Sequence, residues 1–342
     1  MYKFGSRALS RFRFAQRAPE RAKPEPVAES TVPEPPPPNQ PAFPDGHFYS
    51  PIVNVEEASA QASTLWPAHG CSDVPGIEFD AASHCHILDE VFPRYIADYD
   101  YPERLDEAEP AGFFSQNSQF SWLDARAYFV FLRHFSPRRV IEVGAGFSTL
   151  LLVDVNRRFM DNRIGVTCIE PYPRPFVTRL GTTQIELVVK KVQDVPLERF
   201  QALRAGDILF IDSSHVAKTG SDVNFLYFEV LPRLARGVRV HIHDVFLPFE
   251  YPRAWVIDEN RSWNEQYLVR AYLMHSHSFR VTFGSSYAFL RFPDRVCAAL
   301  ALQSGAGFGG GSLWIEKIAL RPPAGQVGGG ADRHADQGFA GR

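Results

Sequence analysis

The sequence predicts an α/β fold, a doubly wound and mostly parallel sheet with helices on both faces. Three observations predict it. Short segments rich in Val, Ile and Leu alternate with segments of helical spacing along the middle of the chain. The short segments are continuous apolar runs, which is typical of parallel strands buried on both faces. The first of them ends in a glycine-containing turn that opens a helix, at residues 142–149.

Each element can be placed from these patterns. Strands are predicted where a short apolar run is bounded by Gly, Pro or polar residues, and helices where apolar residues recur three or four positions apart. The predicted strands are residues 139–143, 165–169, 185–189, 207–211, 237–242, 279–283 and 312–316. The predicted helices are residues 149–159, 222–234 and 263–275.

The composition changes along the chain and suggests four parts. Residues 1–45 are basic and then Pro-rich, and residues 321–342 are Gly-rich and polar, so both are expected to be disordered tails. Residues 46–135 have a less regular pattern and are expected to form an N-terminal extension that could act as a lid. Residues 136–320 hold the predicted sheet and are expected to form the ligand-binding domain.

The first 23 residues contain seven basic residues and a single acid, Glu20. An Arg-rich, acid-poor start resembles an organellar transit peptide, but a disordered basic tail is the interpretation that we favour. No apolar h-region is present, which argues against a secretory signal. No apolar run approaches the roughly 20 residues that a membrane-spanning helix needs. We expect a cytoplasmic protein, with an organellar location as the alternative.

The overall composition narrows the class of partner. The chain has 342 residues, of which 45% are hydrophobic and 22% charged, and a net charge of −3. This charge does not favour a nucleic-acid-binding surface, and we expect a small-molecule substrate instead. The four cysteines are scattered without any C-x-x-C pair, which argues against a zinc site or a disulfide framework and fits a reducing compartment.

The glycine turn after the first predicted strand is the first candidate binding site. Gly144, Ala145 and Gly146 would let the backbone turn sharply and approach a ligand closely. Glu142, just before them, suits a ligand with a positively charged amino group. A dinucleotide fingerprint would have a third glycine where Thr149 stands, so a pyrophosphate site is disfavoured. A purely structural tight turn is the alternative interpretation.

Two further segments have the spacing of a nucleoside site. Glu170 ends the second predicted strand, 24 residues after Gly146, where a carboxylate can accept hydrogen bonds from ribose hydroxyls. Gln193 and Asp194 follow the third strand and could contact an adenine edge. Asp194 could equally cap the helix that begins near Pro196.

Acids and histidines follow the fourth and fifth predicted strands. Asp212 and His215 lie just beyond the fourth strand, at the edge where ligands bind in open parallel sheets. In the fifth strand His241 and His243 share one face by alternation, and Asp244 falls at the strand end. These groups could form an acid/base pair or a divalent metal site, or serve as hydrogen-bonded support. Our first choice of catalytic base is His215, followed by Asp244 and His243.

At these residues the chain resembles the class I S-adenosylmethionine-dependent methyltransferases, and more closely the bacterial proteins known as methyltransferase family 24. The resemblance covers roughly residues 46–320 and is more specific for the fold than for the substrate. The stretches that carry it are 140–149, 168–173, 207–222, 240–252 and 263–267.

The resemblance implies a Rossmann-like sheet of seven strands with the last strand antiparallel. It implies that Glu142 and residues 144–146 surround the amino-acid part of the cofactor, with Glu170 on the ribose and Asp212 near the sulfonium. Related sugar and catechol O-methyltransferases hold a magnesium ion with acids at the ends of the fourth and fifth strands, where this chain has Asp212 and Asp244. The second of the paired acids after the fifth strand is Val245 here, which argues against metal dependence.

The expected activity is therefore methyl transfer from S-adenosyl-L-methionine to an oxygen or nitrogen of a small molecule, with His215 removing the proton. Two alternatives stay open at this stage. One is a nicotinamide-dependent oxidoreductase, against which the missing third glycine counts. The other is a cofactor-binding module without catalysis, against which the group of His215, His243 and Asp244 counts.

Overall fold

The computed structural model describes residues 40–67, 74–301 and 310–319. Residues 45–342 form one compact unit, and residues 1–44 are a separate unit of which only the last five residues are described. The tails predicted to be disordered therefore lie almost wholly outside the described residues, as does Cys71. Among the described helices, none is long and apolar enough to cross a membrane.

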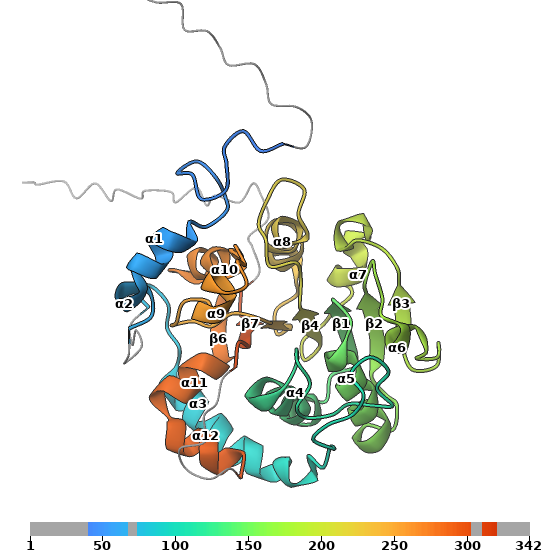
Figure 1. Ribbon diagram of the computed structural model, residues 1–342. Coiled ribbons are helices and arrows are strands. Elements are labelled where there is room, and N and C mark those ends of the chain that lie inside the picture. Colours follow the sequence, from blue (N-terminus) through green and yellow to red (C-terminus); the bar gives the residue numbers. More distant parts are fainter. Residues whose placement is uncertain (1–39, 68–73, 302–309, 320–342) are drawn as a thin grey trace, which may run out of the picture. The chain divides into compact units, whose positions relative to one another are not determined.

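A seven-stranded sheet forms the centre of the compact unit (Figure 1). Its spatial order is β3-β2-β1-β4-β5-β7-β6. The pairs among β1 to β5 are parallel, and β7 runs antiparallel to both of its neighbours, β5 and β6. The predicted mostly parallel sheet with an antiparallel last strand is confirmed. The strands are β1 (Arg139–Val143), β2 (Gly165–Ile169), β3 (Glu186–Val188), β4 (Ile208–Ile211), β5 (Arg239–Ile242), β6 (Phe279–Gly284) and β7 (Leu313–Lys317).

Helices precede and connect the strands. Those before the sheet are α1 (Val55–Ala60), α2 (Ala62–Leu65), α3 (Ala81–His86), η1 (Ile87–Val91), η2 (Phe92–Arg94), η3 (Ile96–Asp98) and α4 (Trp122–Phe135). Those between β1 and β5 are α5 (Phe147–Phe159), α6 (Pro175–Thr178), η4 (Val192–Asp194), α7 (Leu197–Gln201), α8 (Asp222–Phe225), η5 (Leu226–Val230) and η6 (Leu231–Arg233). Those after β5 are α9 (Arg253–Ile257), α10 (Glu265–Leu273), α11 (Ser285–Arg291) and α12 (Pro293–Ala299).

The predicted helix at 222–234 is helical from Asp222 to Arg233 but is not uniform. It begins as the α-helix α8, widens into the π-helical η5, and ends as the 3-10 helix η6. Pro232 lies in this last turn. A proline lacks the backbone N–H of an α-helical hydrogen bond and its ring crowds the preceding turn, so the chain tightens there and the helix ends.

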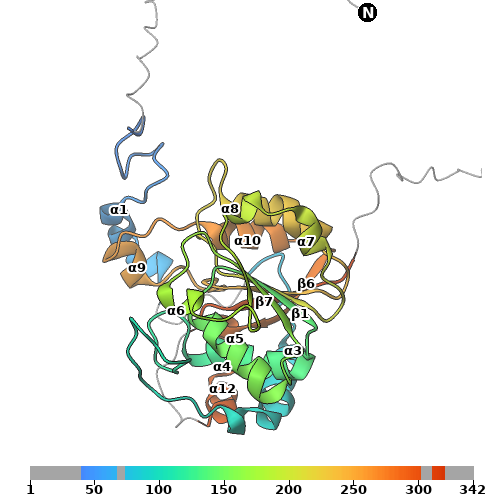
Figure 2. The same ribbon diagram turned by 90° about the vertical axis from the view of Figure 1, so that its right-hand side faces the viewer.

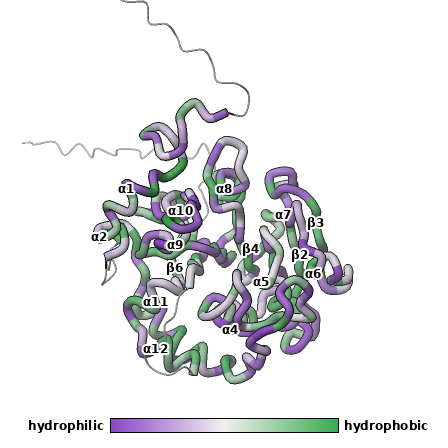
Figure 3. Tube along the Cα trace, viewed as in Figure 1, coloured by the Kyte–Doolittle hydropathy of each residue, from purple (hydrophilic) through white to green (hydrophobic). Residues whose placement is uncertain are grey.

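The sheet is covered on both faces, as predicted (Figure 2). Successive strand residues alternate between two hydrophobic cores: Val140 and Phe210 belong to the core beneath α4 and α5, and Ile141 and Leu209 belong to the core beneath α7, α8 and α10. Hydrophobic residues run along the strands and the helices packed on them, while hydrophilic residues gather in the outer loops (Figure 3).

Part of the predicted N-terminal extension contributes to one of these cores. Leu123, Tyr128 and Phe131 of α4 are fully buried among side chains of α5 and the sheet. The helix therefore covers one face of the sheet directly. A lid role for the rest of residues 46–135 stays a prediction.

Candidate active site

The turn after β1 brings its glycines against the end of β4. Gly144 has φ +86°, in the left-handed region that favours glycine. A Cβ atom at Gly144 would lie 2.1 Å from the backbone oxygen of Asp212, whereas a Cβ at Gly146 would meet no heavy atom within 4 Å. The backbone N–H of Asp212 also donates to the carbonyl of Val143, at 2.8 Å. Gly144 is therefore required for the close approach of the turn to Asp212.

Glu142 lies behind this turn, not in an open cavity. Its carboxylate is fully buried and accepts hydrogen bonds from Thr149 Oγ1 at 2.7 Å and from the Tyr128 hydroxyl at 3.2 Å. Thr149 Oγ1 in turn accepts from the N–H of Gly146 at 3.1 Å. Burial raises the pKa of Glu142 to about 7, against the lowering effect of these hydrogen bonds. Glu142 thus stabilises the turn indirectly, through its hydrogen bond with Thr149.

Two cavities open in front of the turn, with volumes of about 520 Å³ and 260 Å³. Both are lined by Gly144, Glu170, Tyr172 and Asp212. The larger extends toward the ends of β2, β3 and β4, and the smaller toward the start of α5. Because they share four lining residues, the two cavities form one continuous surface that an elongated ligand could occupy.

Glu170 is placed at the junction of the two cavities. Its carboxylate accepts a hydrogen bond from the N–H of Tyr172 at 2.8 Å and another from the N–H of Ala145 at 3.3 Å. A carboxylate has about four lone-pair sites. The group is therefore oriented by the backbone and still has acceptor sites for ligand hydroxyls.

Gln193 and Asp194 are separated by the structure. Gln193 lines the larger cavity and donates from Nε2 to the carbonyl of Gly220 at 2.9 Å. Its buried Oε1 has no hydrogen-bond partner among the described residues. Asp194 is exposed and does not line either of the two cavities. Of the two residues, Gln193 is the one positioned to contact a bound ligand.

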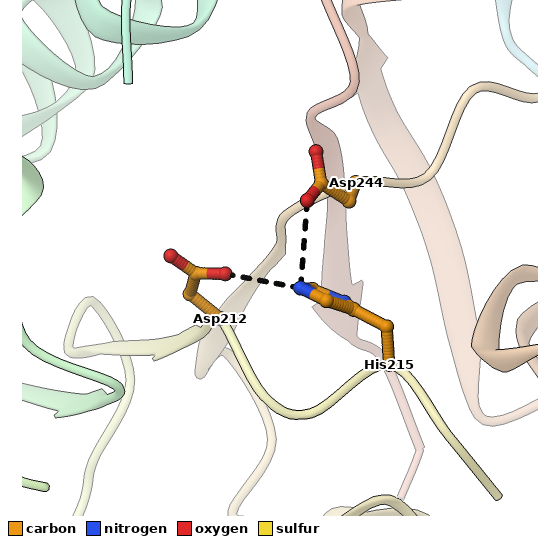
Figure 4. Close-up of side chains that lie close together, drawn as sticks. All are labelled: Asp212, His215 and Asp244. Carbon is orange, nitrogen blue, oxygen red and sulfur yellow. Dashed lines mark ion pairs between the residues drawn. The ribbon is translucent and has the colours of Figure 1, made fainter. Parts of the chain in front are cut away.

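Asp212, His215 and Asp244 converge at the ends of β4 and β5 (Figure 4). The Nε2 atom of His215 lies 3.3 Å from Asp212 Oδ1 and 3.4 Å from Asp244 Oδ2. One ligand atom from each residue lies within 4.8 Å of the others. His215 and Asp244 both have positive φ, 59° and 57°. Non-glycine residues rarely adopt this conformation, and it often marks functional sites. The predicted proximity of these three residues is found.

The other side of His215 is held by a carboxylate from α10. Glu265 Oε2 lies 2.9 Å from His215 Nδ1 and accepts from Ser213 Oγ at 3.0 Å, while its Oε1 accepts from the Tyr227 hydroxyl at 3.0 Å. Glu265 is 1% exposed. Glu265 is not among the site residues predicted from the sequence, because it lies in the predicted helix 263–275, well after the fifth strand in the chain.

His243 is a second imidazole at the same acid pair. Its Nδ1 lies 3.6 Å from Asp212 Oδ1 and 3.5 Å from Asp244 Oδ1, and its Nε2 lies 3.8 Å from Asp124 Oδ2. The N–H of Gly311 donates to the same oxygen of Asp124 at 2.8 Å. Asp124 was also missed, since it precedes β1 in the chain and only the packing of α4 brings it here.

His241 faces the same side of β5 as His243, as predicted, with ring centroids 5.9 Å apart. It does not join the acid cluster. Its ring stacks on Phe210 at 4.0 Å, and its Nε2 lies 2.7 Å from Ser312 Oγ. Burial lowers the pKa of His241 well below its ordinary value, so the ring is neutral and belongs to the core.

The cluster pushes the pKa values of its two acids apart. Burial alone would raise the pKa of Asp212, but His243 and His215 outweigh it and lower that pKa. For Asp244, burial prevails over the same two imidazoles and raises the pKa. Burial would lower the pKa of both histidines, but their carboxylate neighbours raise it, to about 9 for His243 and well above the ordinary value for His215. Divergent pKa values of neighbouring groups are typical of acid/base sites.

Comparison with known proteins identifies the family. A family model described as a methyltransferase domain matches residues 141–245. A protein of Archaeoglobus fulgidus, itself uncharacterized, is 37% identical over 163 residues, which span 47% of this chain and 73% of that one. The chain belongs to the class I S-adenosylmethionine-dependent methyltransferases, which confirms the resemblance noted in the sequence.

Solved structures show more distant similarity. A candidate O-methyltransferase from Klebsiella pneumoniae is 14% identical, with 70% of this chain and 98% of that one covered and a TM-score of 0.36. A candidate methyltransferase from Thermobifida fusca is also 14% identical, with 75% and 100% covered and a TM-score of 0.36. Similarity this distant says nothing about the substrate.

Proposed function

We propose that this protein transfers the methyl group of S-adenosylmethionine to an oxygen or nitrogen of a small molecule, at the cluster of Asp212, His215 and Asp244. The observation that carries the proposal is the position of Asp212. Its side chain lines both cavities in front of the glycine turn and also lies 3.3 Å from His215. Cofactor cavity and acid/base cluster therefore meet at one residue.

The two cavities suit the two ends of the cofactor. In the larger one, Glu170 would accept hydrogen bonds from the ribose hydroxyls, and the unpartnered Oε1 of Gln193 would accept from the adenine amino group. The smaller one, beside Gly144–Ser148, would hold the amino-acid part. The sulfonium would then lie between the two cavities, near the carboxylate of Asp212, where a negative charge would stabilise the cation.

His215 is the proposed proton acceptor. With Nδ1–H donated to Glu265, the neutral ring would present the lone pair of Nε2 to the acceptor. The acceptor's O–H or N–H proton passes to Nε2 while its lone pair attacks the methyl carbon. The C–S bond breaks, and its electron pair stays on sulfur as S-adenosylhomocysteine. Against the lowering effect of burial, the neighbouring carboxylates raise the pKa of His215, whereas the positive charge of the sulfonium would lower it and so favour the neutral base.

The same three residues fit a divalent metal ion as an alternative arrangement, in which Nε2 of His215 would be a metal ligand and not the proton acceptor. Asp212 and Asp244 would each supply a carboxylate oxygen and His215 would supply Nε2, with Glu265 orienting the ring from behind. One imidazole and two carboxylates suit Mn²⁺ or Zn²⁺ better than Mg²⁺, which prefers oxygen ligands. A bound ion would lower the pKa of an acceptor hydroxyl.

Thermal unfolding with and without metal tests this fit. If the cluster holds a metal, added Mn²⁺ should raise the Tm of the chelator-treated wild type by about 2–5 °C. It should leave the Tm of Asp244→Asn unchanged. An equal rise in both proteins, or in neither, would rule out a metal at this cluster.

A methyl-release screen against a metabolite library tests the proposed reaction. The assay would measure formation of S-adenosylhomocysteine by the wild type, by His215→Gln, and by His86→Gln as a control on an exposed histidine of α3. We expect at least one acceptor to be turned over by the wild type and the control, and about 100-fold more slowly by His215→Gln. Full activity of His215→Gln would refute the assigned base. Full cellular activity of variants substituted at His215, His243 and Asp244 would favour a non-catalytic cofactor-binding module.

A further inference from the structure

Arg174 places a cationic side chain in the smaller cavity, at the end next to α5. The residue comes directly before α6, and its guanidinium packs over the rings of Phe147, at 5.6 Å, and Phe176, at 5.8 Å. It lines the cavity together with Gln119 and Ser148. The proposed chemistry at Asp212 and His215 does not use it.

A neutral side chain holds this guanidinium. Arg174 Nη2 donates to Gln119 Oε1 at 2.7 Å. Within residues 40–67, 74–301 and 310–319, Arg174 forms no ion pair with a carboxylate, in contrast to Arg158, which pairs with two. Hydrogen bonds from Ser118 and, to a smaller extent, the guanidinium charge of Arg174 lower the pKa of Glu107. Arg174 and Glu107 form no ion pair, however, so the remaining N–H groups of Arg174 stay available for an anion.

The loop that carries Gln119 is fixed by Asn117. The buried amide of Asn117 donates from Nδ2 to the carbonyls of Phe114, at 2.8 Å, and Phe120, at 2.7 Å, while its Oδ1 accepts from the N–H of Phe120 at 2.6 Å. Gln119 and Phe120, which both line the smaller cavity, are thus presented by an ordered turn directly before α4. Gln119 contacts Arg174 from a predefined position.

We propose that Arg174, oriented by Gln119, binds the α-carboxylate of the cofactor's methionine part. The inference rests on the proposed function. It assigns the charged residues that line the smaller cavity to the two charged groups of the ligand. Arg174 lines that cavity together with two acids, Asp212 and Glu170, so the same cavity offers a cationic group and two carboxylates. A zwitterion would be oriented by this pattern, with its carboxylate toward Arg174 and its ammonium group toward the acids. Residues preceding α4 thereby become part of the cofactor site.

Calorimetry with two ligands on the full-length chain tests the assignment. S-adenosylhomocysteine carries the carboxylate, whereas 5′-methylthioadenosine keeps the nucleoside and lacks the whole amino-acid part. The variants are Arg174→Met, which keeps the apolar stem, Arg174→Lys, which keeps the charge, and Gln119→Ala. Arg179→Met is the matched control, because Arg179 is an exposed arginine five residues away on the same segment.

We expect Arg174→Met to weaken the binding of S-adenosylhomocysteine about 10–100-fold and the binding of 5′-methylthioadenosine less than about twofold. Arg174→Lys and Gln119→Ala should cause smaller losses for S-adenosylhomocysteine alone, and Arg179→Met should change neither ligand. Equal losses for both ligands in Arg174→Met, or no loss for S-adenosylhomocysteine in any Arg174 variant, would overturn the assignment while leaving the proposed function intact. If the wild type bound neither ligand, both would fail.

Discussion

His215 lies between two carboxylates at its Nε2 and a third at its Nδ1, where Glu265 Oε2 is 2.9 Å away. Glu265 is itself fixed by Tyr227 and Ser213. When the ring is neutral, the Glu265 carboxylate therefore keeps the ring proton on Nδ1, which faces the protein interior. The other nitrogen is left to face the cavity side, where Asp212 lies.

From the contact between Glu265 and His215, we predict that removing the charge of Glu265 lowers turnover without weakening cofactor binding. Glu265→Gln keeps the shape of the side chain but removes its charge, so the ring is no longer held in one tautomer. We expect kcat to fall about 10–100-fold with any acceptor found in the screen. The Kd of S-adenosylhomocysteine should stay within about twofold. Tyr227→Phe removes a single hydrogen bond to the same carboxylate and should have a smaller effect; an equally large one would indicate general misfolding of the site.

We predict that the two glycines of the turn after β1 differ strongly in how well they tolerate substitution by alanine. Gly144→Ala forces a Cβ to 2.1 Å from the Asp212 carbonyl and strains a positive φ. We expect the free energy of unfolding to fall by more than about 2 kcal/mol. Gly146→Ala meets no atom within 4 Å and should change it by less than about 1 kcal/mol. Chemical denaturation measures both, and equal destabilisation would contradict the packing described for Gly144.

His84 predicts a dependence of stability on pH. Its ring is buried, with Nδ1 3.0 Å from the Asp80 carbonyl and Nε2 accepting from the N–H of Gly284 at 2.9 Å. Burial lowers the pKa of His84, against the raising effect of its contacts with Asp80, so the folded protein prefers the neutral ring. The unfolded chain then binds the extra proton more readily, and stability falls as the pH drops below about 6.5.

Urea denaturation of the wild type and His84→Gln between pH 8 and pH 5 measures this effect. The stability advantage of the wild type should be greatest above pH 7. It should shrink by up to about 1.4 kcal/mol per pH unit between the two pKa values of the imidazole. An advantage that stayed constant, or grew on acidification, would contradict a neutral His84.

Gln193 predicts recognition of the adenine amino group. Because its Oε1 is buried without a partner among the described residues, an N–H from the ligand would remove an unsatisfied acceptor. Gln193→Ala should weaken the binding of S-adenosylhomocysteine about 3–10-fold. It should weaken the binding of the inosine analogue much less, because that analogue lacks the amino group. Asp194→Ala, at the exposed neighbour, should change neither affinity. A loss limited to Asp194→Ala would move the contact to that residue.

The fold could be predicted from the sequence because its signals are local. Buried parallel strands such as 207–211 are continuous apolar runs, and the turn at 144–146 needs glycine for steric reasons that a sequence shows directly. The antiparallel last strand followed only from the family resemblance. The change of helix type at Pro232 is visible in the sequence in hindsight, as a proline near the end of a predicted helix.

The site was predicted only in part, because some of its residues come from elements that are distant in the chain. Asp212, His215 and Asp244 follow strands that the sequence identifies, so their meeting at one sheet edge could be foreseen. Asp124 and Glu265 come from helices that reach this edge through tertiary packing. Glu142 was predicted to face the ligand. The alternation of side chains along a strand does not by itself determine whether Glu142 faces the ligand or the core. The structure places its carboxylate behind the turn, against Thr149.

The central claim is that the cavities around Glu170 hold S-adenosylmethionine. Titration calorimetry of the wild type and Glu170→Ala with S-adenosylhomocysteine tests it most directly. We predict binding by the wild type with a Kd of about 1–100 μM. Glu170→Ala should bind about 10–100-fold more weakly, because the ribose hydroxyls would lose their proposed carboxylate acceptor. Absence of wild-type binding at about 1 mM ligand, or unchanged affinity in Glu170→Ala, would contradict the account.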